Sequence, residues 1–244
     1  MKTLIKIAVS LSALIFIAFS LDWSSVIESI SGVTWWAIPA ASLLQVCGFL
    51  IGTNRWYTLL RAHGMPCRRM ELVRPYFIGA FLNNFLPTST GGDAFRVYHI
   101  HSDRRGAAAA FSPIITERFL GLLTMLLIAQ ISFLFLDRSS TIIRHALNVI
   151  YFAFSVQVIL LLLFAFPATY RPLHRFMERF AKFPLCAGFL DVAQAVHESV
   201  KRLRLVLKVV VISVLTQSCV IGTFWIIGKG VGVELSPIYF MFPF

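Results

Sequence analysis

The sequence is poor in charged residues. Asp, Glu, Lys and Arg make up only 14% of its 244 residues, against about 25% in soluble domains. Hydrophobic residues make up 58%, and mean hydropathy is +0.79. A soluble fold of this length could not bury that much apolar surface, so we expect lipid to be the solvent around most of the chain. The same composition excludes a disordered chain and a collagen-like one.

Cysteine pairs and catalytic motifs are also missing. The 4 cysteines are scattered without a Cys-x-x-Cys pair, so they indicate neither a disulfide framework nor a metal site. His99, His101 and Asp103 lie two residues apart, a spacing that suits a metal-binding strand better than the helix expected there. No Gly-x-Ser-x-Gly, P-loop, His-Glu-x-x-His or Rossmann pattern occurs. We therefore expect no metal, no cofactor and no enzymatic activity of the chain itself.

Acidic residues are scarcer than basic ones, 11 against 22, and the net charge is +11. In a soluble chain such an excess would suggest a nucleic-acid partner. Here the bases lie in loops between apolar runs, which is typical of the positive-inside bias and of attraction to anionic lipid. We expect membrane lipids as partners and no nucleic acid.

Five apolar runs are long enough to cross a bilayer as helices, which takes about 20 residues. They are, approximately, residues 4–21, 35–60, 113–136, 146–169 and 207–228. Trp35, Trp36, Trp56 and Tyr57 are interpreted as interfacial aromatics of the second run. The sequence thus predicts an all-α, polytopic membrane protein whose residues 1–244 form a single domain.

Two further segments do not fit a simple span. Residues 75–92 carry no charge but contain asparagines, a proline and glycines, which favours a re-entrant segment over a lipid-facing helix. In residues 186–204, apolar side chains recur every three or four positions, which predicts an amphipathic surface helix.

The distribution of Lys and Arg predicts the orientation. With a cytoplasmic N-terminus and a re-entrant 75–92 segment, 17 bases lie inside and 3 outside. A full crossing by residues 75–92 would move the eight bases between Arg171 and Lys208 outside, so the asymmetry favours re-entry. An alternative for the N-terminus is a signal peptide, but only further membrane segments follow it.

Residues 83–96 carry the first group of candidate site residues. Asn83 and Asn84 lie in an apolar run, where an unpaired amide costs about 1–3 kcal/mol, so they are expected to face protein, water or a ligand. Gly91 and Gly92 permit positive φ, so their backbone N–H groups are candidates for an anion-binding nest.

A helix is expected to follow these glycines. Asp93 is a candidate N-cap of this helix, and Arg96, one turn later, could hold a phosphate with its planar fork. The alternative is an ordinary re-entrant turn, with a capping residue and glycine as a helix breaker.

Glu117 and Arg118 follow Pro113 and are expected to open the third long helix. Because intramembrane charges usually face a cavity or a partner, Glu117 needs a base, which could be Arg96, Arg55 or another one. Arg118 lies near the inner end of its span, where it can reach the headgroup level. An ion pair that only fixes helix packing and a gating or ligand-binding role are both open.

These motifs resemble the flippase-like integral membrane family related to the transmembrane region of lysylphosphatidylglycerol synthases. The matching residues are Arg55-Trp56, Tyr76, Gly79, Phe81, Asn83, Leu86-Pro87, Gly91-Gly92-Asp93, Arg96, Glu117-Arg118 and Gly121. The similarity of layout extends from the first predicted helix to the C-terminus. It implies a multi-pass inner-membrane protein that flips or handles anionic or polyprenyl-linked lipids.

The sequence departs from the family pattern at its end. Family members are typically longer and carry a second Pro- and Gly-rich re-entrant motif, whereas here the last apolar stretch is Pro237–Phe244, which is too short to span. We therefore expect a fragment of a longer protein.

The resulting hypothesis is a lipid translocase. Arg96, Arg118 and the Gly91–Asp93 backbone would hold a headgroup phosphate, and Asn83 and Asn84 would line a polar groove. Two alternatives are a membrane subunit that presents lipid to an aminoacyl- or glycosyl-transferase on another chain, and a structural assembly protein. The sequence makes no prediction of the oligomeric state.

Overall fold

The computed structural model is mainly helical in the residues that it describes, and none of these residues forms a strand. These are residues 12, 16, 19–24, 27, 31–65, 67–85, 91–100, 106–135, 141–179, 190, 193–194 and 196–241. Four of the helices in these ranges contain stretches long and apolar enough to cross a membrane: Ala37–Ala62, Ala110–Phe133, Leu147–Ala165 and Leu203–Gly230. The predicted all-α membrane fold is confirmed. The expected first span, 4–21, lies outside the described residues apart from isolated positions.

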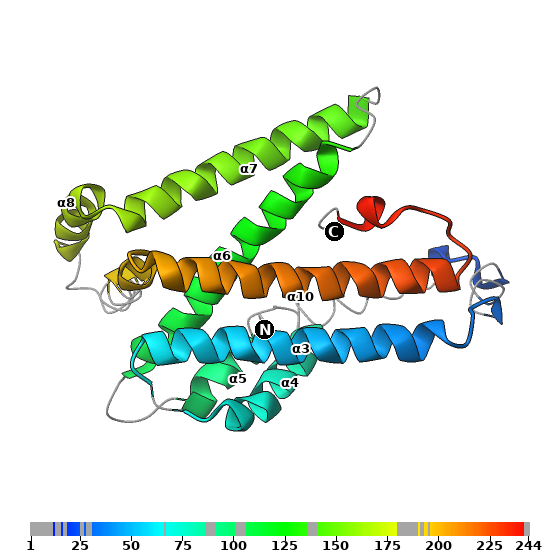
Figure 1. The fold of residues 1–244 in the computed structure, drawn as a ribbon, viewed down its shortest axis with the longest axis horizontal. Coiled ribbons are helices and arrows are strands. Elements are labelled where there is room, and N and C mark those ends of the chain that lie inside the picture. The colour runs from blue at the N-terminus through cyan, green and yellow to red at the C-terminus, as the bar shows by residue number, and fades with distance from the viewer. Residues whose placement is uncertain are drawn as a thin grey trace.

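Helices α3 (Ala37–Ala62) and α10 (Leu203–Gly230) form an antiparallel pair along the long axis of the molecule (Figure 1). Small residues let them approach closely. A Cβ on Gly48 would lie 3.1 Å from Cys219 Cβ, and one on Gly222 would lie 2.7 Å from Leu44 Cδ2. Close contact through small residues is the usual way in which membrane helices associate.

The next two long helices leave this pair at an angle. Helix α6 (Gly106–Phe133) crosses beside α10, and α7 (Thr141–Ala165) packs on α6 (Figure 1). Helix α8 (Pro167–Glu178) follows after Phe166, and a short 3₁₀ helix, Pro237–Met241, follows α10.

A helical hairpin connects α3 to α6. Its arms are α4 (Arg69–Phe85) and α5 (Gly91–Ile100), about 26 Å and 15 Å long, so neither reaches across a hydrocarbon core of about 30 Å. Gly79 on α4 lies against Arg96 on α5, and Asn83, one turn later on α4, accepts a hydrogen bond from Gly92, one turn earlier on α5. The two arms therefore run antiparallel.

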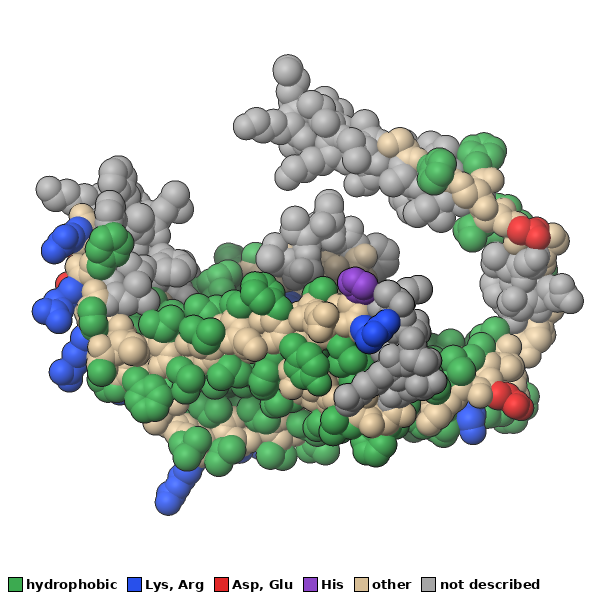
Figure 2. Space-filling view, turned by 90° about the horizontal axis from the view of Figure 1, so that it is seen from above, with side chains coloured by type: hydrophobic (Ala, Val, Ile, Leu, Met, Phe, Trp, Pro, Cys, Tyr) green, Lys and Arg blue, Asp and Glu red, His purple; other side chains and the backbone are tan. Residues whose placement is uncertain are grey.

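The chain therefore returns to the end of the bundle at which it entered the hairpin. At that end Arg202 Nη1 donates to Ala62 O at 3.0 Å, and Ser199 Oγ lies 3.1 Å from His63 Nε2. The end of α3 and the beginning of α10 thus lie together, and Lys and Arg side chains gather where α8 lies (Figure 2). This path agrees with a re-entrant 75–92 segment, whose depth in a bilayer stays a prediction.

Several expected helix boundaries differ from the structure. Helix α6 begins at Gly106, not at residue 113, because Pro113 is tolerated inside it after an alanine run. The span expected over 146–169 ends earlier, since α7 stops at Ala165. Phe166 precedes Pro167, and a residue before proline disfavours helical backbone. The helix expected over 186–204 ends at Val200 in the described residues, and Leu203 already begins α10.

Candidate functional site

A cavity of about 480 Å³ lies among α3, α4, α5, α6 and α10. Its lining combines charged and amide side chains with apolar ones. The lining residues are Phe49, Arg55, Tyr76, Ala80, Asn83, Arg96, Glu117, Arg118, Gly121, Leu122, Met125 and Gln217. This is the mixed lining expected of a site for an amphipathic ligand.

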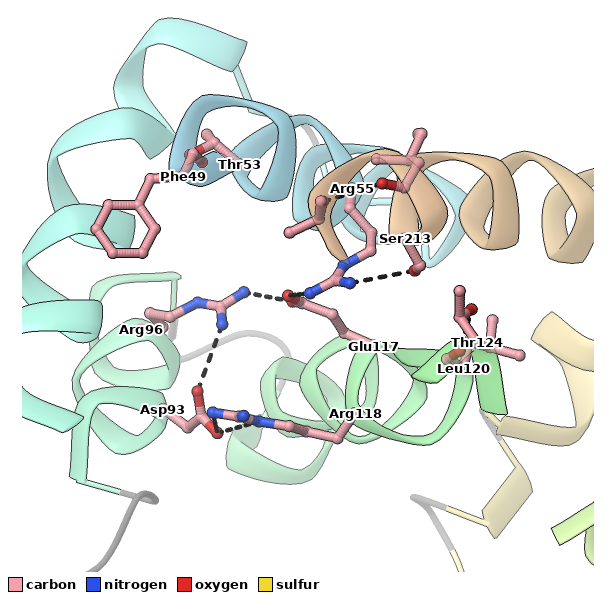
Figure 3. A network of polar contacts seen from close by, with 12 residues as sticks. Phe49, Thr53, Arg55, Asp93, Arg96, Glu117, Arg118, Leu120, Thr124 and Ser213 are labelled. Carbon is pink, nitrogen blue, oxygen red and sulfur yellow. Dashed lines mark hydrogen bonds and ion pairs between the residues drawn. The ribbon is translucent and has the colours of Figure 1, made fainter. Parts of the chain in front are cut away.

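Glu117 is the centre of a charged cluster in the wall of this cavity (Figure 3). Its side chain lies within α6, not at the start of the helix as the sequence suggested, and the residue is 3% exposed. Arg55 Nη2 donates to Oε1 at 2.8 Å, and Arg96 Nη2 donates to Oε2 at 2.5 Å. Both arginines proposed as partners of Glu117 are thus confirmed as partners.

Asp93 makes a second set of ion pairs. Arg96 Nη1 lies 3.4 Å from its Oδ1, while Nε and Nη2 of Arg118 lie 3.0 and 2.8 Å from its Oδ2. The expectation that Asp93 is the N-cap of α5 is wrong, because the helix begins at Gly91 and Asp93 lies inside its first turn. Its carboxylate is used to hold two arginines.

The two arginines predicted to bind a headgroup differ in access. Arg96 is 4% exposed, and its guanidinium carbon lies 4.3 Å from the Trp56 ring centroid and 4.7 Å from that of Tyr76. The side chain of Arg118 is 55% exposed. Arg118 is therefore placed to meet a ligand, whereas Arg96 is enclosed by protein.

The expected backbone nest does not form at the glycines. Among the described residues, positive φ occurs only at Gly64 and Gly232, and the Gly92 N–H donates to Asn83 Oδ1 at 2.8 Å. Gly92 instead allows close approach, since a Cβ there would lie 1.8 Å from Gly79 O. Gly91 begins α5 as a half-buried residue.

The two neighbouring asparagines have different surroundings. Asn83 lines the cavity, while Asn84 is exposed on α4 and does not line it. The amide of Asn83 therefore serves the hairpin through its bond to Gly92 and also faces the cavity.

Sequence reasoning missed three contributions to the site. Ser213 on α10 accepts a hydrogen bond from Arg55 Nη1 at 3.1 Å, although nothing in the apolar run around it marks it out. Trp56 was expected at the membrane interface but is fully buried beside Arg96, because an aromatic near the end of an apolar run fits either place. Gln217, a polar residue in the apolar run of α10, lines the cavity.

Membrane-length apolar helices around a buried charged cluster define a multi-pass membrane protein. The chain belongs to the family described as Lysylphosphatidylglycerol synthase TM region, which matches residues 3–243. The resemblance inferred from the motifs is thereby confirmed.

A curated relative is the UPF0104 membrane protein PH1989 of Pyrococcus horikoshii. The two chains are 30% identical over 101 residues, which cover 40% of this chain and 30% of the length of the relative. No solved structure matches this chain.

Proposed function

We propose that this protein binds lipids with anionic or polyprenyl-phosphate headgroups and moves them across the bacterial inner membrane. The observation that supports this most directly is the cavity, where charged side chains meet apolar walls between membrane-length helices. The cluster contains three arginines and two carboxylates, so one positive charge is uncompensated. An uncompensated charge at such a place favours an anionic ligand.

Arg118 is the residue that contacts the headgroup in this proposal. Its side chain is the most exposed of the three arginines in the cluster, and its planar fork can bind two phosphate oxygens. Asp93 holds Arg118 in place until a phosphate competes for it. Leu122 and Met125 line the same cavity and would lie beside the start of the acyl chains.

Translocation in this scheme needs no covalent step and no cofactor. The basic loops at the hairpin end are taken to face the cytoplasm, together with the N-terminus, in agreement with the positive-inside bias. A headgroup from the inner leaflet would then enter the cavity from the basic end of the bundle.

Proteoliposomes test this proposal. Fluorescent phosphatidylglycerol should move between leaflets in the presence of the protein, and Arg118→Gln should slow this movement at least about tenfold through loss of a charge-assisted contact. Arg204→Gln is the matched control, because Arg204 is exposed on α10 and does not line the cavity. Equal rates for wild type, Arg118→Gln and protein-free vesicles would contradict the proposal.

A further inference from the structure

A second cavity, of about 630 Å³, lies between α8 and the helical residues that precede α10. Every residue of its lining carries a polar or ionisable group, whereas the first cavity is also lined by wholly apolar side chains. The lining residues are Tyr170, Arg171, His174, Arg175, Glu178, Gln194, His197, Glu198 and Lys201. None of them belongs to the charged cluster around Glu117.

Basic groups lie on both walls of this cavity. Arg171 and Arg175 are one turn apart on α8, and Lys201 lies on the other wall. Two carboxylates are also present. His174 Nδ1 lies 3.2 Å from a carboxylate oxygen of Glu178, so this acid already has a partner within α8.

Tyr170 forms the buried part of the lining. The residue is 7% exposed, and its hydroxyl has no hydrogen-bond partner among the residues that the structure describes. Its ring stacks on His197 with centroids 3.8 Å apart, and His197 Nδ1 bonds the carbonyl of Phe164, so the position of the ring is fixed. A buried hydroxyl without a partner is costly, and phenylalanine would pack in the same way without that cost.

The state of this hydroxyl suits a donor role. Burial and the nearby carboxylates of Glu198 and Glu178 raise the pKa of Tyr170, so the phenol keeps its proton at neutral pH. It therefore requires an acceptor atom that the described side chains do not supply.

We propose that this cavity binds a phosphate group, with the Tyr170 hydroxyl donating to a phosphate oxygen and Arg171, Arg175 and Lys201 neutralising its charge. The cavity lies at the basic end of the bundle, where both a lipid headgroup and a free phosphate compound can reach it. This site is separate from the proposed translocation cavity and does not depend on it.

Hydrogen–deuterium exchange of the detergent-purified full chain locates the binding. Dihexanoyl phosphatidylglycerol or inorganic phosphate should slow amide exchange in residues 167–178 and 196–201. Protection by phosphate alone assigns a soluble ligand, and protection only by the short-chain lipid assigns a headgroup. The proposal is wrong if neither probe protects these segments.

Two variants test the chemistry. Tyr170→Phe and Lys201→Gln should each raise the ligand concentration needed for half-maximal protection at least about tenfold. Tyr239→Phe and Lys208→Gln are matched controls outside the cavity, and Arg118→Gln should leave protection of these segments unchanged. Undiminished protection in Tyr170→Phe would overturn the assignment of the hydroxyl as donor. Since that hydroxyl has no partner in the described part of the chain, the variant should fold like wild type.

Discussion

Arg55 and Arg96 share one carboxylate but depend on it to different degrees. Arg96 also contacts Asp93 and lies against two aromatic rings, Trp56 and Tyr76. Besides Glu117, the described hydrogen-bonding partners of Arg55 are Ser213 and Tyr76, and neither is a carboxylate. Loss of the Glu117 carboxylate would thus leave Arg55 as the unneutralised cation.

Glu117→Gln should lower the free energy of unfolding by about 3–5 kcal/mol, as expected when one partner of a buried pair is removed. Adding Arg55→Met should recover much of this loss, whereas adding Arg118→Met should not, since Arg118 pairs with Asp93. Thermal unfolding in detergent measures both effects. Glu234→Gln, at an exposed position, is the control and should change stability little.

The same variant separates packing from gating. If Glu117→Gln unfolds like wild type yet stops the movement of fluorescent lipid, Glu117 acts in translocation and not only in helix packing. A variant that is stable and moves lipid at the wild-type rate would remove Glu117 from both roles.

Lysine should replace Arg118 more easily than Arg96. Arg96→Lys loses the planar group that lies over Trp56 and Tyr76 and that spans two carboxylates, so we expect a loss of about 1–3 kcal/mol. Arg118→Lys should cost less than about 1 kcal/mol, because its side chain is half exposed. Thermal unfolding of the two variants side by side tests this order, and a reversed order would contradict the enclosure of Arg96.

At the scale of elements, the α4–α5 hairpin depends on backbone contact at one glycine. Gly92→Ala would place a Cβ 1.8 Å from Gly79 O and 2.7 Å from Asn83 Oδ1, so the arms must separate. We expect a loss of at least about 2 kcal/mol in thermal unfolding. Gly121→Ala is the control, since its Cβ would meet only Arg55 Nη1, at an ordinary 3.6 Å. Equal stability of the two variants would contradict the close packing of the hairpin.

Apolar length was enough to predict the helices that face lipid. The runs at 35–60 and 207–228 correspond to α3 and α10 because a long uncharged segment has few alternatives in a membrane. The need of Glu117 for a base was predictable from the cost of a buried charge. The role of Asp93 was not, since a short acid after two glycines fits a helix cap as well as a tertiary ion pair.

At the scale of the whole molecule, the structure brings together segments that the distribution of Lys and Arg predicted to lie on the same side of the membrane. His63, at the end of α3, meets Ser199, and His197 meets the end of α7 through the carbonyl of Phe164. Opposite them, Thr34 N donates to Gly230 O at 2.9 Å. The two ends of the bundle therefore carry distinct sets of loops.

Single cysteines in a background without native cysteines should report this sidedness. Arg69→Cys and Arg179→Cys should both be shielded from an impermeant thiol reagent added outside intact cells, and Glu234→Cys should react. Labelling after cell lysis is the control for accessibility. If the reagent outside intact cells labelled only one of Arg69→Cys and Arg179→Cys, the hairpin would have to cross the membrane.

Helix α7 gives the molecule a sensitivity to bilayer thickness. Its apolar segment, Leu147–Ala165, is only 11% buried, and its 19 residues extend about 29 Å, close to a hydrocarbon core of about 30 Å, so its length matches the lipid that surrounds it. Gln157 Nε2 ties it to Phe119 O at 2.6 Å, and only Phe166 separates it from α8. A thinner bilayer should increase the tilt of α7 and turn α8 relative to the headgroup plane. The thickness of the surrounding bilayer would then set the orientation of α8.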